Sequence, residues 1–167
     1  MPGSDRIAVV TGASSGIGEA TARGLREAGF FVVLGARRQD RLMAVARELR
    51  GRGLPLDVRD LASIDAFTAA IAAEYGQVEI LINNAGLAAG LQPLAQGNDD
   101  DWVQMMETNV LGLLRVTRAM LPCCDAPRAR TSSTWDRSPA SRCIRAAWAT
   151  RRASTPSVPS QKRFASN

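Results

Sequence analysis

The sequence of 167 residues contains no histidine, only one lysine, Lys162, and only one tyrosine, Tyr75. Its three cysteines are Cys123, Cys124 and Cys143, and none of them belongs to a CxxC pair. A structural zinc site takes closely spaced cysteine or histidine ligands. The sequence therefore argues against such a site, and we predict that the protein binds no metal.

Long apolar runs are missing too. No stretch reaches the roughly 18 apolar residues of a membrane-spanning helix, and the N-terminus lacks the basic and then apolar segments of a secretory signal. We therefore expect a cytoplasmic protein that does not enter a membrane. With 46% hydrophobic residues, the chain can form one globular domain with a core, but not two.

Charge is distributed unevenly along the chain. Residues 1–122 hold 12 Arg and 14 Asp or Glu, a net charge of −2, whereas residues 123–167 hold 9 Arg or Lys and 2 Asp, a net charge of +7. The basicity of the protein thus belongs to its last quarter and says nothing about the partners of the rest. We predict a folded region over residues 1–122 and a basic tail over residues 123–167.

The first region alternates between two kinds of apolar pattern. Continuous apolar runs predict buried strands at residues 6–10, 30–34, 54–56 and 78–82. Amphipathic stretches predict helices at residues 16–28, 39–50, 61–75 and 102–120. Strands and helices in alternation require parallel strands joined by right-handed crossovers. The predicted fold class is therefore α/β, a doubly wound parallel sheet with the strand order 3-2-1-4.

Particular residues define the ends and faces of these helices. Gly29 should end the first helix, and Pro122 should end the last one. The second helix should bury Leu42, Val45, Ala46 and Leu49. The third helix should bury Leu61, Ile64, Phe67, Ala70 and Ile71.

A glycine-rich segment, Thr11-Gly-Ala-Ser-Ser-Gly-Ile-Gly18, directly follows the first predicted strand. Glycines in such a turn let the backbone approach a pyrophosphate, whose charge is met by N–H groups at the start of the next helix. The spacing differs from that of the commoner GxGxxG fingerprint. On its own, the segment is also compatible with a plain strand-to-helix turn.

Three further motifs follow in order: Leu56-Asp-Val58, Asn83-Asn-Ala-Gly86 and Asn109. With the glycine turn, they make residues 6–122 resemble the N-terminal, Rossmann-like portion of the short-chain dehydrogenase/reductase family, truncated to about four strands. The resemblance implies binding of a nicotinamide dinucleotide. It assigns the phosphates to Gly12, Ser14, Ser15, Gly16, Ile17 and Gly18, the adenine to Asp57 and Val58, and the ribose and nicotinamide to Asn84, Ala85 and Gly86.

The end of the second predicted strand indicates which dinucleotide is preferred. A site for NAD needs a carboxylate there for the ribose 2′-OH, but the sequence reads Gly35-Ala-Arg37-Arg38. Two guanidinium groups without an acid between them suit a 2′-phosphate. We predict that NADP(H) is preferred over NAD(H). The alternative is that both arginines are solvated residues at the start of a helix.

The resemblance also implies a chemistry that the sequence only partly supports. Family members transfer a hydride between the nicotinamide and a carbonyl or alcohol, with a Tyr-x-x-x-Lys pair, a Ser upstream of the Tyr, and a supporting Asn. Asn109 matches that Asn, whereas Tyr75 is followed at the required spacing by Glu79, not by a lysine. Without a phenol activated by a neighbouring ammonium there is no general acid, so we expect the chain to be inactive.

The tail is rich in Arg, Ser, Thr and Pro and contains Trp135 and Trp148 without apolar periodicity. It can be interpreted as a disordered terminus or as a basic arm for nucleic acid. We favour a third interpretation, a frameshift product: in a shifted frame, permitted codons from Thr131 onward encode the missing Ser, Tyr and Lys at the family's spacing. We expect the tail to be poorly ordered.

The leading hypothesis is thus a fragment of an NADP-dependent short-chain dehydrogenase/reductase. Its intact parent would act on a small-molecule carbonyl or alcohol and would form a homo-oligomer, without nucleic acid or membrane partners. A non-catalytic NADP-binding or regulatory module is the alternative, and a basic-tailed interaction protein is a third. The nucleotide sequence around codons 120–124 distinguishes the first from the others.

Overall fold

The computed structural model describes residues 6–90 and 92–124. Four parallel strands form one sheet in the order β3-β2-β1-β4, which confirms the predicted order and fold class. The strands are β1 (Ile7–Thr11), β2 (Phe31–Ala36), β3 (Arg52–Pro55) and β4 (Ile80–Ile82). Most of the predicted tail lies outside the described residues.

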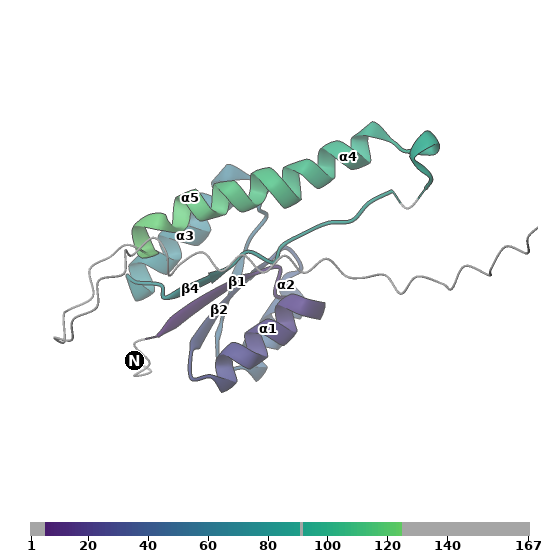
Figure 1. Cartoon of the computed structure of the whole chain (residues 1–167). Coiled ribbons are helices and arrows are strands. Elements are labelled where there is room, and N and C mark those ends of the chain that lie inside the picture. Colours follow the sequence, from purple (N-terminus) through teal and green to yellow (C-terminus); the bar gives the residue numbers. More distant parts are fainter. Residues whose placement is uncertain (1–5, 91, 125–167) are drawn as a thin grey trace, which may run out of the picture.

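Helices cover both faces of this sheet (Figure 1). The elements are α1 (Gly16–Glu27), α2 (Gln39–Glu48), α3 (Leu61–Tyr75), a short 3-10 turn η1 (Leu94–Gln96), α4 (Asp99–Met106), a π-helical segment η2 (Glu107–Gly112) and α5 (Leu113–Cys124). The last three run on without a break as one long helix (Figure 1). Among the described residues, no helix combines the length and apolarity required to cross a bilayer.

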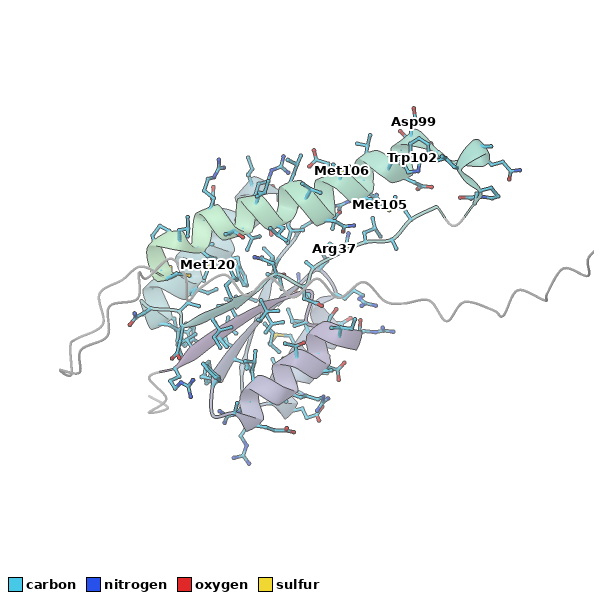
Figure 2. The ribbon with its side chains drawn as sticks, viewed as in Figure 1. Arg37, Asp99, Trp102, Met105, Met106 and Met120 are labelled. Carbon is cyan, nitrogen blue, oxygen red and sulfur yellow. The ribbon has the colours of Figure 1, made fainter. Side chains whose placement is uncertain are left out.

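The core has two layers because successive strand residues point to opposite faces. Val9 and Val33 belong to the layer under α3 and α5, whereas Val10 and Leu34 belong to the layer under α1 and α2. This burial on both faces explains why the strands read as continuous apolar runs. Figure 2 labels Met120 and Met106, two residues of the long helix. The side chain of Met120, in α5, is fully buried, whereas Met106, in α4, is 57% exposed.

The predicted face of α3 is only partly correct. Ile64, Phe67 and Ile71 are buried, and Ala70 packs against the core, but Leu61 is 51% exposed. Leu61 is the first residue of α3, directly after the cap Asp60, whose side chain accepts the N–H of Ala62. The prediction for Leu61 is therefore wrong. The sequence pattern identifies the apolar face of α3 but not which residues at the start of the helix reach the core.

The prediction that Pro122 ends the last helix is also wrong. Pro122 lies inside α5 with its ring exposed, and the helix continues to Cys124. Proline removes one hydrogen bond from a helix, but Cys123 and Cys124 are buried in the layer under α3 and α5. The carbonyl of Cys123 also accepts the N–H of Val78, at 3.0 Å. Tertiary packing therefore holds the last turn.

Two substitutions on α3 test this assignment of buried and exposed residues. Ile71 is fully buried, so Ile71→Ala should lower the free energy of unfolding by about 2 to 5 kcal/mol. Leu61→Ala, the matched control, should change it by less than about 0.5 kcal/mol because the side chain is largely exposed. Urea denaturation of the purified variants measures both values. Equal losses would contradict the observed placement of Leu61.

Candidate functional site

A cavity of about 840 Å³ lies at the carboxyl ends of the strands. The strand order reverses between β1 and β4, and ligands of open α/β sheets bind at such a point. All the predicted site residues except Gly18 line the cavity. They are Gly12, Ser14, Ser15, Gly16, Ile17, Arg37, Arg38, Asp57, Val58, Asn84, Ala85, Gly86 and Asn109.

The glycine turn forms one wall of the cavity and needs its glycines for different reasons. Gly16 has φ +62°, and a Cβ there would meet nothing within 4 Å, so only its backbone conformation requires glycine. Gly12 has φ +66°, and a Cβ there would lie 2.7 Å from the Cα of Ala85. Ser15, the N-cap of α1, makes no side-chain cap hydrogen bond. The first N–H groups of α1 thus remain uncapped by that side chain, as an anion site requires.

Gly18 lies behind this wall. A Cβ at Gly18 would collide with the side-chain amide of Asn84 and would lie 2.5 Å from the carbonyl oxygen of Gly12. Its role in the structure is therefore close packing of α1 against the turn, which is one of the functions of glycine in dinucleotide-binding turns.

Thr11, which the sequence analysis did not assign to the site, connects the glycine turn to the segment after β4. Its hydroxyl accepts the N–H groups of Asn84 and Ala85, both at 3.0 Å, and donates to the carbonyl of Ile82 at 3.4 Å. In return, the side-chain amide of Asn84 donates to the carbonyls of Thr11, at 3.1 Å, and Gly12, at 3.2 Å. A polar residue at the end of a fully buried strand was the available signal, because buried hydroxyls need partners.

Asn109 forms the opposite wall, on η2. Its side-chain oxygen accepts the N–H of Leu87 and its side-chain nitrogen donates to the carbonyl of Leu87, both at 2.8 Å. The amide thus holds both backbone polar groups of Leu87, in the loop after β4. The sequence predicted a regular helix here, whereas the observed π-helical segment is a feature often found at functional sites.

Arg37 and Arg38 follow β2 and line the cavity, and Figure 2 labels Arg37 at the end of the sheet. The Nη2 atom of Arg38 donates to the hydroxyls of Ser15, at 2.6 Å, and Ser14, at 3.3 Å. Arg38 therefore lies across the start of α1, where its charge adds to the positive end of the helix dipole.

Asp57 follows β3 and is held by Arg59, another residue that the sequence analysis did not assign. Its Oδ2 accepts from Nη2 of Arg59 at 2.7 Å, and its Oδ1 accepts from Nε and from the backbone N–H of Arg59, both at 3.0 Å. These hydrogen bonds, with a contribution from the charge of Arg37, lower the pKa of Asp57 to about 2. The carboxylate is thus ionised throughout the physiological pH range.

Tyr75 lies near the amino ends of the strands, whereas the cavity lies at their carboxyl ends. Its ring packs against Phe31, the first residue of β2, at 5.5 Å between centroids. Its hydroxyl donates to the carboxylate of Glu74, and burial followed by this contact raises the pKa of the phenol above its usual range. The single tyrosine of the chain is therefore no part of the candidate site.

Comparisons with known proteins indicate the family and the fold. A family model described as short chain dehydrogenase matches residues 6–132. The NADP-dependent 3-hydroxy acid dehydrogenase YdfG of Salmonella typhi is 43% identical over 118 residues, which cover 70% of this chain and 48% of the relative. The chain thus spans about half the length of the curated relatives it matches.

Solved structures show the same fold with either dinucleotide. An alcohol dehydrogenase from the archaeon Thermococcus sibiricus, complexed with 5-hydroxy-NADP, has a TM-score of 0.68 and 36% identity, covering 72% of this chain and 53% of that one. A 3-ketoacyl-(acyl-carrier-protein) reductase from Brucella melitensis, complexed with NADH, has a TM-score of 0.68 and 30% identity, covering 72% of this chain and 50% of that one.

The contact between Asp57 and Arg59 should make stability depend on pH. The folded pKa of about 2 lies below the ordinary 3.8, so the stabilisation is present above pH 4 and is lost as the pH falls toward 2. The substitution Asp57→Asn should make the loss of unfolding free energy at low pH smaller by about 1 to 2 kcal/mol. One pKa unit is worth about 1.4 kcal/mol before solvent screening. Urea denaturation from pH 5 to pH 2.5 measures it. The control is Asp65→Asn, at an exposed aspartate on α3, which should leave the pH dependence of stability unchanged. Parallel curves of unfolding free energy against pH for wild type and Asp57→Asn would contradict the expectation.

Proposed function

The chain belongs to the short-chain dehydrogenase family, and we propose that it is the cofactor-binding portion of an NADP(H)-dependent carbonyl or alcohol oxidoreductase. One observation carries this proposal. The glycine turn, the two arginines after β2 and the Asn84–Gly86 segment line one continuous cavity. The cavity thus combines an anion site at a helix start with two cations at the position that selects between the dinucleotides.

The residues present fit such a cofactor. The uncapped start of α1 and the glycine turn would hold the pyrophosphate, and Arg37 and Arg38 would hold the 2′-phosphate. Asp57 and Val58 would flank the adenine, and the Asn84–Gly86 segment would flank the nicotinamide. When bound, NADPH would supply a hydride to a carbonyl carbon.

The same cavity explains why we propose that this chain does not turn over carbonyls. Reduction of a carbonyl leaves an alkoxide, which needs a proton donor. The loop after β4 and the long helix contribute Asn83 to Ala88, Thr108, Asn109 and Leu113 to the lining, and none of these side chains is an acid or a base. Within the described residues, Asn109 can position the loop but cannot supply the proton.

We further propose that a shift of reading frame near codon 123 replaced the family's catalytic segment. The chain matches the family over residues 6–132, yet the sequence holds no Tyr-x-x-x-Lys pattern, because its one tyrosine is Tyr75 and its one lysine is Lys162. The intact parent would act on a small carbonyl or alcohol and form a homo-oligomer. Sequencing of the gene around codons 120–124 tests this: an insertion or deletion there supports the shift, and an unbroken frame contradicts it.

A non-catalytic NADP-binding module is a second candidate. It is favoured by the fact that, among the described residues, the glycine turn, the two arginines after β2 and the Asn84–Gly86 segment already line the cavity together. The two candidates agree on binding and differ on the origin of the tail. The gene sequence therefore separates them as well.

Cofactor selectivity should follow the two arginines. In the double variant Arg37→Ala/Arg38→Ala, the Kd of NADPH should rise at least about 10-fold, because each hydrogen bond to a charged group contributes about 1.5 to 3 kcal/mol. The Kd of NADH should change little. Titration of the purified chain with both cofactors, followed by nicotinamide fluorescence, measures this. The control is Arg47→Ala, at an exposed arginine at the far end of α2. Equal losses of affinity for NADPH and NADH in the double variant would show that Arg37 and Arg38 do not contact the 2′-phosphate.

Catalytic turnover should be undetectable in the same preparation. Loss of a general acid costs about 10²- to 10⁴-fold in rate, and no described residue replaces it. NADPH oxidation with a panel of ketones and aldehydes is the measurement, and binding of NADPH by the same sample is the positive control. Turnover that Asn109→Ala abolishes would refute this expectation.

A further inference from the structure

We propose that Arg59 and Arg115 are positioning residues that link the adenine end of the cavity to the wall carrying Asn109, so that occupancy of the adenine end fixes the loop around Leu87. We call the set Asp57, Arg59, Glu107 and Arg115 the clasp. This inference rests on the proposed NADP(H) site. It concerns how the two ends of that site are connected.

The clasp begins at the cavity wall. The side chain of Arg59 folds back onto Asp57, two residues earlier, through two hydrogen bonds of 2.7 and 3.0 Å, and the backbone N–H of Arg59 adds a third of 3.0 Å. Both oxygens of the carboxylate are engaged, and the side chains are only 27% (Asp57) and 35% (Arg59) exposed. A pair with this two-pronged geometry is better ordered than a single surface contact. The turn after β3 therefore presents the backbone of Arg59 in a defined position.

Arg115 makes the connection to the long helix. Its Nη1 atom donates to the carbonyl oxygen of Arg59 at 3.2 Å and to Oε2 of Glu107 at 2.8 Å. Glu107 is the first residue of η2, and Arg115 lies just after the end of η2. The ion pair thus brackets the whole π-helical segment. One guanidinium group joins both ends of this segment to the adenine side of the site.

Close packing supports the same connection. A Cβ at Gly112 would lie 2.7 Å from Cγ2 and 3.0 Å from Cβ of Val58, so η2 lies directly against the predicted adenine wall. The hydroxyl of Thr108 is buried and has no hydrogen-bond partner among the described residues. Thr108 therefore does not anchor η2, whereas Glu107 does so through its ion pair with Arg115.

From η2 the connection reaches the nicotinamide end. Asn109 holds the backbone N–H and C=O of Leu87 by two hydrogen bonds of 2.8 Å, and Leu87 itself lines the cavity. A ligand that fixes the turn at Asp57 therefore also fixes Arg59, then Arg115 and η2, and finally Leu87. Coupling of this kind requires a physical connection whose position both ends influence, and the clasp supplies it.

Adenosine 2′,5′-bisphosphate tests the inference because it contains the adenine and the 2′-phosphate but lacks the nicotinamide. Its binding to the full chain should slow hydrogen exchange of the Leu87 amide by about 5-fold or more, the lower range of coupling between sites. In Arg115→Met, which keeps an unbranched apolar stem, the ligand should still bind but should no longer slow this exchange. Arg118→Met, an exposed arginine one turn further on α5, should behave like wild type.

The outcomes separate the inference from the proposed function. No binding of the bisphosphate by wild type would overturn the proposed cofactor site, and the inference with it. Binding with no effect at Leu87, or an effect that persists in Arg115→Met, would overturn the inference alone. Glu107→Gln, which keeps the side-chain length but removes the ion pair, is the second variant if Arg115→Met does not fold. It should reduce the effect at Leu87, and an unchanged effect would also refute the clasp.

Discussion

The close contact between the glycine turn and the segment after β4 is the constraint on which the rest of the site depends. Asn84 donates its backbone N–H to the Thr11 hydroxyl and its side-chain amide to the Thr11 carbonyl, and a Cβ at Gly12 or Gly18 would keep the two segments apart. Both segments leave the sheet from neighbouring parallel strands, so their backbones meet at the carboxyl edge. Because this contact fixes where β4 ends, it also fixes the loop that Asn109 holds. The cavity is thus a consequence of how two strand ends approach each other.

Much of the fold could be predicted because its determinants are local. The strands are apolar runs, and the buried faces of α2 and most of α3 follow helical periodicity, so Leu42, Val45, Ile64 and Phe67 were assigned correctly. The exposed Leu61 and the internal Pro122 could not be predicted in this way. Leu61 depends on where α3 leaves the sheet, and Pro122 depends on the burial of the two cysteines after it. Both are properties of tertiary packing.

The candidate site also contains residues that the sequence predicted and residues that it did not. Glycines, arginines and asparagines that belong to sequence motifs were found at the cavity, with Gly18 just behind it. Thr11, Arg59 and the π-helical segment were not anticipated. Arg59 and Thr11 act through partners that are close in space: Arg59 contacts Arg115 from a distant helix, and Thr11 contacts Asn84 from another strand end. A motif read along the chain does not contain these pairs.

The residues that line the cavity differ in charge from one part of it to another. At one end, Arg37 and Arg38 face a carboxylate, Asp57, whose charge is already compensated by Arg59, so positive charge is in excess. Such an excess favours a ligand with an additional phosphate over one with a free hydroxyl. At the other end, amides, hydroxyl and aliphatic groups line the wall, and no described group there titrates near neutral pH. Under the proposed function, residues 6–124 would bind and orient a dinucleotide, and the proton donor would have to come from outside the described residues. Strand β4 pairs on one side only, with β1, among the described residues. An unpaired apolar strand edge readily accepts another strand, so β4 is an edge at which a further strand would extend the sheet.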